Sequence, residues 1–229
     1  SFICDELNEN SIIEGTTGYG IKATKSNCII KMDETSKVTS TGNHGLYIDK
    51  DIEQTIDGGN YETTSKNGNS IYSNAGNITI KNLIINSTNT AIYLNGGTAT
   101  IESGEIKSES GNGIYNRSNL TINGGYISSE TSYGIDNNGT LTMNNGKVES
   151  TSRYGIYNYS YTSIINGGEI HSKKSYAFAN SGGKLTVNGG TFTSDESIAL
   201  YNVYWFGVWD PHHTTTTING GTFKSTKSY

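Results

Sequence analysis

The residues best suited to binding a ligand are concentrated in one segment near the C-terminus. Residues 203–216, VYWFGVWDPHHTTT, contain both tryptophans, the only proline and two of the four histidines of the chain. Exposed Trp and Tyr side chains are common anchors for sugars and proteins, and loops on a rigid scaffold often carry binding sites. The candidate ligand-binding residues of this segment are Tyr204, Trp205, Phe206, Trp209, Asp210, His212 and His213.

The same segment has a second interpretation, in which its aromatic side chains pack against the end of the fold and close it. Trp205 and Trp209 are only four residues apart, so we expect one indole to be packed and the other partly exposed. Adjacent histidines rarely bind one metal ion unless a helix or strand orients them. We therefore predict no metal site at His212 and His213, and no cofactor.

A second group of chemically active side chains recurs through the middle of the chain. Tyrosines occupy one outward position at Tyr47, Tyr72, Tyr93, Tyr115, Tyr157 and Tyr201, with Asp136 and Ala179 at the matching positions in between. Such a column could stack against the sugar rings of an extended glycan, or it could stabilise neighbouring strands by about 0.2–1 kcal/mol per pair. The candidate ligand-binding residues here are Tyr115 and Tyr157 of this column and the neighbouring Tyr159.

Asp136 interrupts this column, and Arg117 is expected beside it on the neighbouring turn of the chain. A carboxylate, a guanidinium and several phenols could act as acid and base on a polysaccharide, which makes Asp136 and Arg117 the candidate catalytic residues. An exposed Asp–Arg pair is more often a weak ion pair, and the patch lacks the second carboxylate of a glycosidase. The sequence therefore favours a non-catalytic protein.

These side chains can meet only if the chain folds as a repeat. Residues 111–130, GNGIYNRSNLTINGGYISSE, contain three short apolar pieces that alternate with polar residues, which is typical of strands with one buried face. The first apolar position recurs at Ile21, Leu46, Ile71, Ile92, Ile114, Ile135, Ile156, Phe178 and Leu200. The residue before the Gly-Gly corner recurs at Asp57, Lys81, Glu102, Asn123, Asn144, Asn166, Asn188 and Asn219. Both series keep a period of 21 to 25 residues, except for one interval of 31 that contains the aromatic segment, and this agreement indicates a true repeat.

The repeat predicts an all-β fold, a single-stranded, right-handed parallel β-helix of about nine coils with three strands in each coil. Residues 19–229 would form the β-helix, with a loop insertion at about 203–216, and residues 1–18 would cap its N-terminal end. An inward asparagine recurs at Asn116, Asn137, Asn158, Asn180 and Asn202. We expect these amides to hydrogen-bond from coil to coil.

Composition restricts the classes of partner. A net charge of −5 argues against nucleic acid, which needs a basic surface. No run of about 18 apolar residues is present, so no membrane insertion is expected. The chain begins at Ser1 without a targeting segment, and we expect it to be part of a longer chain. Cys4 and Cys28 could form a disulfide or remain free thiols.

The pattern G-I-Y-N…L-T-I-N-G-G-x-I-x-S, beginning at Gly113 and again at Gly155, resembles the pectin-lyase-like β-helix repeats of bacterial surface and adhesin proteins, especially those of Gram-positive bacteria. The resemblance covers about residues 19–229 and implies the parallel β-helix. Proteins of this fold include lyases, adhesins and passive stalks. The acidic calcium ligands and the Arg or Lys base of the enzymes cannot be matched residue by residue.

Three functional hypotheses follow. The first is a non-catalytic segment of a secreted or cell-surface bacterial protein that binds a glycan or a host surface protein in adhesion, or serves as a rigid spacer. The alternative is a polysaccharide lyase or hydrolase. A minor alternative is an ice-binding solenoid, because outward threonines recur at Thr55, Thr79, Thr100, Thr121, Thr142, Thr186 and Thr217. Lys81, Glu102 and Ile164 interrupt those ranks and weigh against it.

Overall fold

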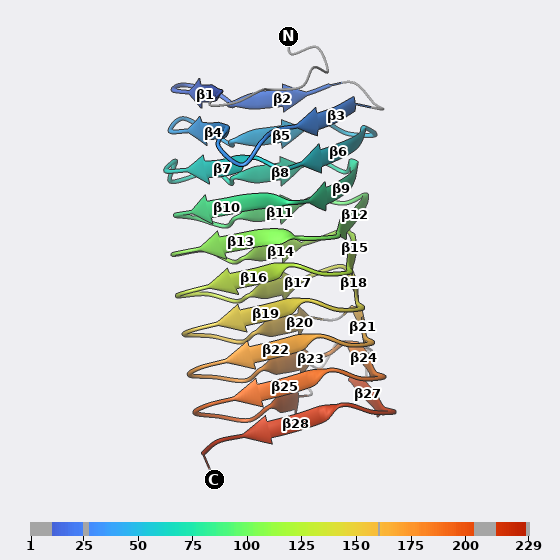
Figure 1. The fold of residues 1–229 in the computed structure, drawn as a ribbon. Helices are drawn as coiled ribbons and strands as arrows, with labels where there is room; N and C mark the ends of the chain where they lie inside the picture. Colours follow the sequence, from blue (N-terminus) through green and yellow to red (C-terminus); the bar gives the residue numbers. More distant parts are fainter. Residues whose placement is uncertain (1–10, 25–27, 160, 204–213, 228–229) are drawn as a thin grey trace, which may run out of the picture.

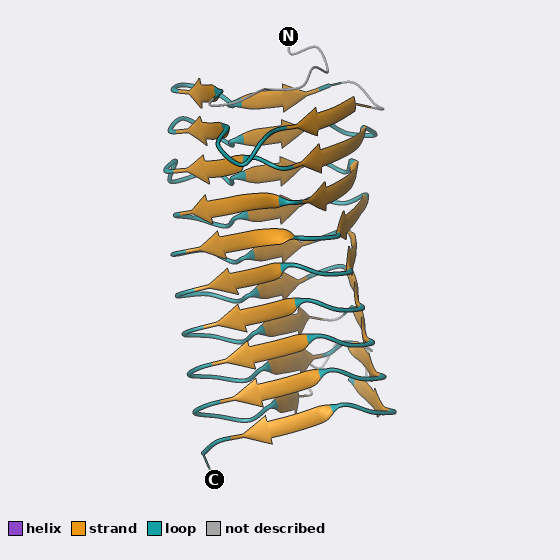
Figure 2. Cartoon of the chain, in the orientation of Figure 1, coloured by secondary structure: helices purple, strands orange, loops and turns teal. Residues whose placement is uncertain are grey.

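The chain forms a right-handed parallel β-helix, as the repeat predicts (Figure 1). The computed structural model describes residues 11–24, 28–159, 161–203 and 214–227. Within these ranges every regular element is a strand (Figure 2). No helix in the described part of the chain is long and apolar enough to cross a membrane.

Each coil contributes one strand to each of three parallel sheets. The sheet that carries the outward tyrosines, called the tyrosine sheet, contains β2 (Ile21–Ala23), β5 (Leu46–Ile48), β8 (Ile71–Ser73), β11 (Ile92–Leu94), β14 (Ile114–Asn116), β17 (Ile135–Asn137), β20 (Ile156–Tyr159), β23 (Phe178–Ser181) and β26 (Leu200–Val203). The sheet that carries the outward threonines, called the threonine sheet, contains β3 (Cys28–Lys31), β6 (Glu53–Asp57), β9 (Asn77–Lys81), β12 (Thr98–Ile101), β15 (Asn119–Ile122), β18 (Thr140–Met143), β21 (Thr162–Ile165), β24 (Lys184–Val187) and β27 (Thr215–Ile218).

The third sheet has ten strands, most of which end in a serine, and is called the serine sheet. It contains β1 (Ile12–Gly15), β4 (Lys37–Ser40), β7 (Asn60–Thr63), β10 (Leu83–Ser87), β13 (Gly104–Ser108), β16 (Tyr126–Ser129), β19 (Lys147–Ser150), β22 (Glu169–Ser172), β25 (Thr191–Ser194) and β28 (Thr222–Ser225). Strand β1 lies inside the segment 1–18 that was predicted to be a cap, and it pairs in parallel with β4. Residues 1–10 lie outside the described residues.

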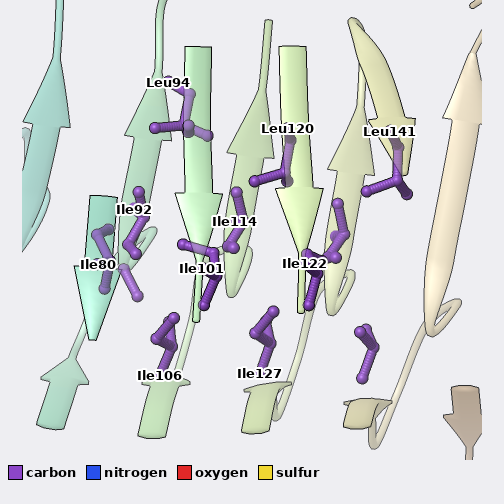
Figure 3. Close-up of a cluster of buried hydrophobic side chains, with 14 of the residues drawn as sticks. Ile80, Ile92, Leu94, Ile101, Ile106, Ile114, Leu120, Ile122, Ile127 and Leu141 are labelled. Atoms are coloured by element: carbon purple, nitrogen blue, oxygen red, sulfur yellow. The ribbon is translucent and has the colours of Figure 1, made fainter. Parts of the chain in front are cut away.

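Strand register confirms the inward positions predicted from the repeat. Ile114 pairs with Ile92 on one side and Ile135 on the other, and all three side chains are fully buried. Figure 3 shows the resulting stacks, in which isoleucine and leucine side chains from successive coils meet inside the β-helix. Burying one such side chain contributes about 1.5–3 kcal/mol. The core is therefore a set of axial columns, each built from similar residues.

A Gly-Gly corner follows five of the threonine-sheet strands, β6, β15, β21, β24 and β27, and its second glycine is needed for its backbone conformation. Gly125 has φ +87°, a left-handed value that L side chains rarely adopt. A side chain at Gly124 meets a different obstacle, because its Cβ would lie 2.6 Å from the carbonyl oxygen of Glu102 on the preceding coil. Asn145 takes the position of Gly124 one coil later, whereas the second position is again a glycine with positive φ, Gly146, so the second glycine is the one that this corner requires.

A column of buried serines stabilises the turns that follow the strands of the serine sheet. The Ser129 hydroxyl accepts a hydrogen bond from the N–H of Ser132 (2.9 Å) and donates one to the carbonyl of Gly111 on the preceding coil (2.7 Å). Ser150 makes the same two contacts one coil later, with Arg153 N–H and the carbonyl of Ser132. Each hydroxyl satisfies two backbone groups that the turn would otherwise leave unpaired.

Candidate functional site

The tyrosine column predicted from the sequence is present on the tyrosine sheet. Strand pairing aligns Tyr93 with Tyr115, Tyr115 with Asp136, and Asp136 with Tyr157. Ala179 occupies the next position, and Tyr201 follows it. The tyrosines of the column are half-buried, because each ring lies against its neighbours along the axis.

The rings of this column stack on one another. Centroid distances are 5.6 Å for Tyr47–Tyr72, 5.1 Å for Tyr72–Tyr93 and 4.8 Å for Tyr93–Tyr115. Stacked aromatic pairs contribute about 0.5–1.5 kcal/mol beyond their buried area. Because most ring faces are covered by other rings, the column presents ring edges and hydroxyls outward. This arrangement favours the stabilising interpretation over sugar stacking for most of the column's length.

A second aromatic column, which sequence reasoning missed, runs beside the first. It consists of Tyr133, Tyr154 and Tyr176, whose successive ring centroids are 5.3 and 5.1 Å apart. The ring of Tyr176 also stacks on that of Tyr201, at a centroid distance of 4.3 Å. Its signal in the sequence is Tyr two residues before the first inward residue of the strand, as in Tyr-Gly-Ile. Tyr19 and His44 hold the same position in the first coils.

Asp136 is the one acidic residue within the tyrosine column. The Nδ2 group of Asn138 donates a hydrogen bond to its Oδ1 (2.7 Å), and Asn112 also hydrogen-bonds the carboxylate. Burial raises the pKa of Asp136 to about 6, and these hydrogen bonds only partly oppose the effect. No Lys, Arg or His of the described ranges forms an ion pair with it.

Arg117 lies on the coil before Asp136 but is directed elsewhere. Its guanidinium hydrogen-bonds the side chain of Tyr93, one coil further toward the N-terminus, and this contact raises the pKa of Arg117. The phenols of Tyr115 and Tyr161 are close enough to act electrostatically on the same guanidinium. The two candidate catalytic residues therefore share a sheet without forming the pair that the sequence suggested.

Two fully outward tyrosines lie next to this group. Tyr159 and Tyr161 are each 47% exposed, and the ring centroid of Tyr159 is 6.1 Å from that of Tyr157. Tyr161 interacts electrostatically with both Tyr115 and Arg117. Tyr115, Arg117, Tyr157, Tyr159 and Tyr161 are called the tyrosine–arginine cluster. Its members include all three tyrosines predicted on this sheet as ligand-binding candidates.

Comparison with protein families, curated proteins and solved structures finds no match to this chain. The fold is shown by the strand pairing alone. Any assignment of function therefore depends on the chemistry of the surface, where the tyrosine–arginine cluster contains two tyrosines that are each 47% exposed, one of them close to Arg117.

The threonine sheet carries the regular polar ranks noted in the sequence. Thr100, Thr121 and Thr142 are in register. In the adjacent asparagine rank, Nδ2 of Asn144 donates to Oδ1 of Asn123 at 2.8 Å, and Asn166 donates to Asn144 at 2.8 Å. These amides use one another as partners, which leaves less of their hydrogen-bonding capacity for a ligand such as ice.

A charged group lies on the outer face of the serine sheet. The Glu149 carboxylate forms ion pairs with Lys147 Nζ (3.0 Å) and Lys173 Nζ (3.4 Å). Nearby, His171 Nε2 lies 3.1 Å from a carboxylate oxygen of Asp195. Such partly exposed ion pairs contribute little to stability. Within the described residues no three His, Cys, Asp or Glu side chains are placed to hold a metal ion.

The aromatic insertion and the cysteines are largely outside the described residues. This applies to the candidates Tyr204, Trp205, Phe206, Trp209, Asp210, His212 and His213, to Cys4, and to the side chain of Cys28. The two ends of the insertion are described and lie together, since Thr214 Oγ1 donates a hydrogen bond to the carbonyl of Val203 (2.9 Å). The different roles expected for Trp205 and Trp209 remain a prediction.

Proposed function

We propose that the chain is a non-catalytic β-helical segment of a secreted or cell-surface bacterial protein, and that it binds a partner protein through the tyrosine–arginine cluster. The observation that supports this function is the exposure of Tyr159 and Tyr161 at the end of β20, with Tyr161 close enough to Arg117 to act on it electrostatically. Tyr and Arg are the residue types enriched at energetically important interface positions. The resemblance of the repeats to those of bacterial surface proteins agrees with this location.

Two features favour a protein over an extended glycan as the partner. The rings of the tyrosine column cover one another's faces, whereas a sugar needs a free face to stack on. The exposed tyrosines and Arg117 instead combine aromatic area with hydrogen-bond donors, which suits a mixed polar and apolar protein surface. The axial columns also make the segment a rigid rod, so a spacer role is compatible with the same proposal.

Catalysis is the weaker alternative on geometric grounds. Asp136 has Asn112 and Asn138 as its hydrogen-bond partners, and Arg117 hydrogen-bonds Tyr93. Acid–base cleavage of a glycan needs two positioned groups around the scissile bond. We expect no unsaturated or reducing-end products when the protein is incubated with plant, microbial and host polysaccharides. Turnover that is lost in Asp136→Asn would overturn the non-catalytic assignment.

The binding proposal is tested by replacing the two exposed tyrosines. We expect the double variant Tyr159→Ser/Tyr161→Ser to keep its unfolding free energy within about 1 kcal/mol, because both side chains are exposed. Binding to immobilised fibrinogen, fibronectin, collagen or mucin, measured by surface plasmon resonance, should fall at least tenfold for any member of the panel that the native chain binds.

Tyr126→Ser is the matched control, because Tyr126 lies on the serine sheet and contacts Lys147 instead of Arg117. It should bind the panel as the native chain does. Tyrosine-dependent binding to a glycan array, with none to the panel, would identify a glycan as the ligand. Panel binding that is equal in all variants would place the binding surface outside the tyrosine–arginine cluster, and binding neither to the panel nor to the array would leave the spacer role.

A further inference from the structure

Asparagine followed by glycine recurs along this chain, and this dipeptide is prone to a spontaneous reaction. The asparagines concerned are Asn67, Asn95, Asn112, Asn123, Asn138, Asn145, Asn166, Asn188 and Asn219. The backbone nitrogen of the glycine can attack the asparagine amide, because glycine has no side chain to obstruct the approach. Asparagine is accordingly one of the thermolabile residue types of proteins. Whether a given site reacts depends on how firmly the fold holds the two groups.

The reaction is deamidation, and it needs no reactant other than water. The glycine nitrogen forms a bond to Cγ of the asparagine, the bond from Cγ to Nδ2 breaks, and ammonia leaves with the proton that the glycine nitrogen has lost. Water then opens the resulting succinimide ring. Addition at one carbonyl gives aspartate, and addition at the other gives isoaspartate, whose backbone contains one additional carbon. Both products carry a carboxylate in place of a neutral amide.

The asparagine ladder on the outside of the threonine sheet holds the amides of its members from both sides. Asn166 Nδ2 donates a hydrogen bond to Asn144 Oδ1 (2.8 Å), and Asn166 Oδ1 accepts one from Asn188 Nδ2 (2.8 Å). Asn188 is held in the same way by Asn166 and Asn219. The Asn166 amide must release both partners before its Cγ can turn toward the nitrogen of Gly167.

Asn145 lies outside this ladder, although it directly follows Asn144. Its side chain is exposed, and within the described part of the chain no hydrogen bond holds its amide. The N–H of Gly146 also has no acceptor among the described residues. In the other Asn-Gly pairs of the described ranges, either the amide or the glycine N–H has a hydrogen-bond partner.

We propose that Asn145 is a site of spontaneous deamidation, and that the asparagine ladder protects the same dipeptide on neighbouring coils. The modification would fall in the corner between β18 and β19. There the Lys147 N–H donates to the Gly125 carbonyl (2.9 Å), and the Gly146 carbonyl accepts from the Glu169 N–H (2.9 Å). Isoaspartate lengthens the backbone just before these contacts, so it loosens the stacking of three successive coils.

The test is incubation of the native chain in mildly alkaline buffer for several weeks, with peptide mass spectrometry of each Asn-Gly site. Labelling with an isoaspartate methyltransferase distinguishes isoaspartate from aspartate. We expect Asn145 to react about tenfold faster than Asn166, because two hydrogen bonds must break before Asn166 can react. In urea, where the ladder is absent, the two sites should react at similar rates.

The variant Asn145→Gly moves the dipeptide into the ladder without removing it. A glycine then follows Asn144, whose Nδ2 donates to Asn123 (2.8 Å) and whose Oδ1 accepts from Asn166 (2.8 Å). The variant has the same Asn-Gly-Gly corner as the coils on either side, so it should fold normally. We expect Asn144 to react as slowly as Asn166 does in the native chain.

The double variant Asn144→Ala/Asn188→Ala removes both partners of Asn166. The deamidation rate at Asn166 should then rise about tenfold, to that of Asn145 in the native chain. Thr186→Ala is the control, because Thr186 is an outward residue of β24 whose side chain makes no hydrogen bond within the described residues. It should leave the rate at Asn166 unchanged.

Each outcome decides the proposal. Equal rates at Asn145 and Asn166 in the folded chain overturn the protection by the ladder, as does rapid reaction at Asn144 in Asn145→Gly. If Asn145 reacts in urea but stays intact in the folded chain while other sites react, the site itself is wrong. An unchanged rate at Asn166 in the double variant would mean that its hydrogen bonds do not control the reaction.

Discussion

Replacing Asn158 with leucine is expected to lower the unfolding free energy by about 4 kcal/mol. The side chain of Asn158 is fully buried in the inward asparagine ladder. Its Nδ2 donates to Asn180 Oδ1 (2.8 Å) and to the carbonyl of Tyr161 (2.9 Å). Its Oδ1 accepts from Asn137 Nδ2 (2.7 Å) and Ser163 Oγ (2.9 Å). Leucine would remove all four contacts, three of which are fully buried, where water does not replace them.

Asn166 is the matched control, because it belongs to an axial ladder of the same residue type on the outside of the threonine sheet. Its Nδ2 donates to Asn144 (2.8 Å) and its Oδ1 accepts from Asn188 (2.8 Å), but the side chain is exposed. Water can replace both partners, so Asn166→Leu should change stability by less than about 0.5 kcal/mol. The comparison uses urea denaturation of both variants. Equal effects would mean that the inward ladder contributes no more than a surface contact.

The inward ladder could be predicted because two regularities of the sequence coincide there. Alternation within a strand assigns Asn116 to the same side as Ile114, and the coil period places Asn137 directly above it. The structure confirms both, with Asn116 Nδ2 donating to Asn137 Oδ1 at 2.6 Å. Position along the axis is thus fixed by the period, and in this ladder the partner of each asparagine follows from that position.

The buried serine column was not predicted, although it is equally regular. Serine is common in turns, so its recurrence after each third strand resembles ordinary loop composition. What identifies Ser129 as structural is its pair of backbone contacts, with Ser132 N–H and the Gly111 carbonyl. Those contacts depend on the path of the turn between two coils, which alternation does not specify.

At the candidate site the position of a short side chain could be predicted, whereas the direction of a long one could not. The position of Asp136 between Tyr115 and Tyr157 follows from the period and is confirmed by the pairing. The direction of Arg117 does not follow, because its long side chain can reach several phenols and carboxylates on adjacent coils. Contact with Tyr93, with Tyr161 nearby, determines its orientation. Ring stacking, which covers the tyrosine faces, also depends on side-chain rotation and not on spacing.

Between pH 4 and 6.5 two residues, His44 just before β5 and Asp136 within β17, should change stability in opposite directions. Burial lowers the pKa of His44 to about 4, and its Nδ1 accepts the N–H of Asn69 (3.0 Å), which requires the neutral ring. The unfolded chain therefore binds more protons at this site, and stability rises with pH from about 4 to 6.5. The raised pKa of Asp136, about 6, means that the folded chain binds more protons there, so its contribution to stability falls as pH rises from about 4 to 6.

Each shift would correspond to about 3 kcal/mol for a fully buried group, and partial exposure reduces this to about 1–2 kcal/mol. The two slopes offset each other in the native chain, and single variants separate them. Asp136→Asn should become more stable by about 1–2 kcal/mol as pH rises from 4 to 6.5, because Asp136 no longer offsets the His44 slope. His44→Asn, which supplies the same kind of acceptor that Asn112 offers to Tyr133 N–H, should become less stable by a similar amount over that range. Urea denaturation at constant ionic strength measures both slopes. If both variants keep the pH dependence of the native chain, neither residue changes its protonation on unfolding and the two shifts are absent.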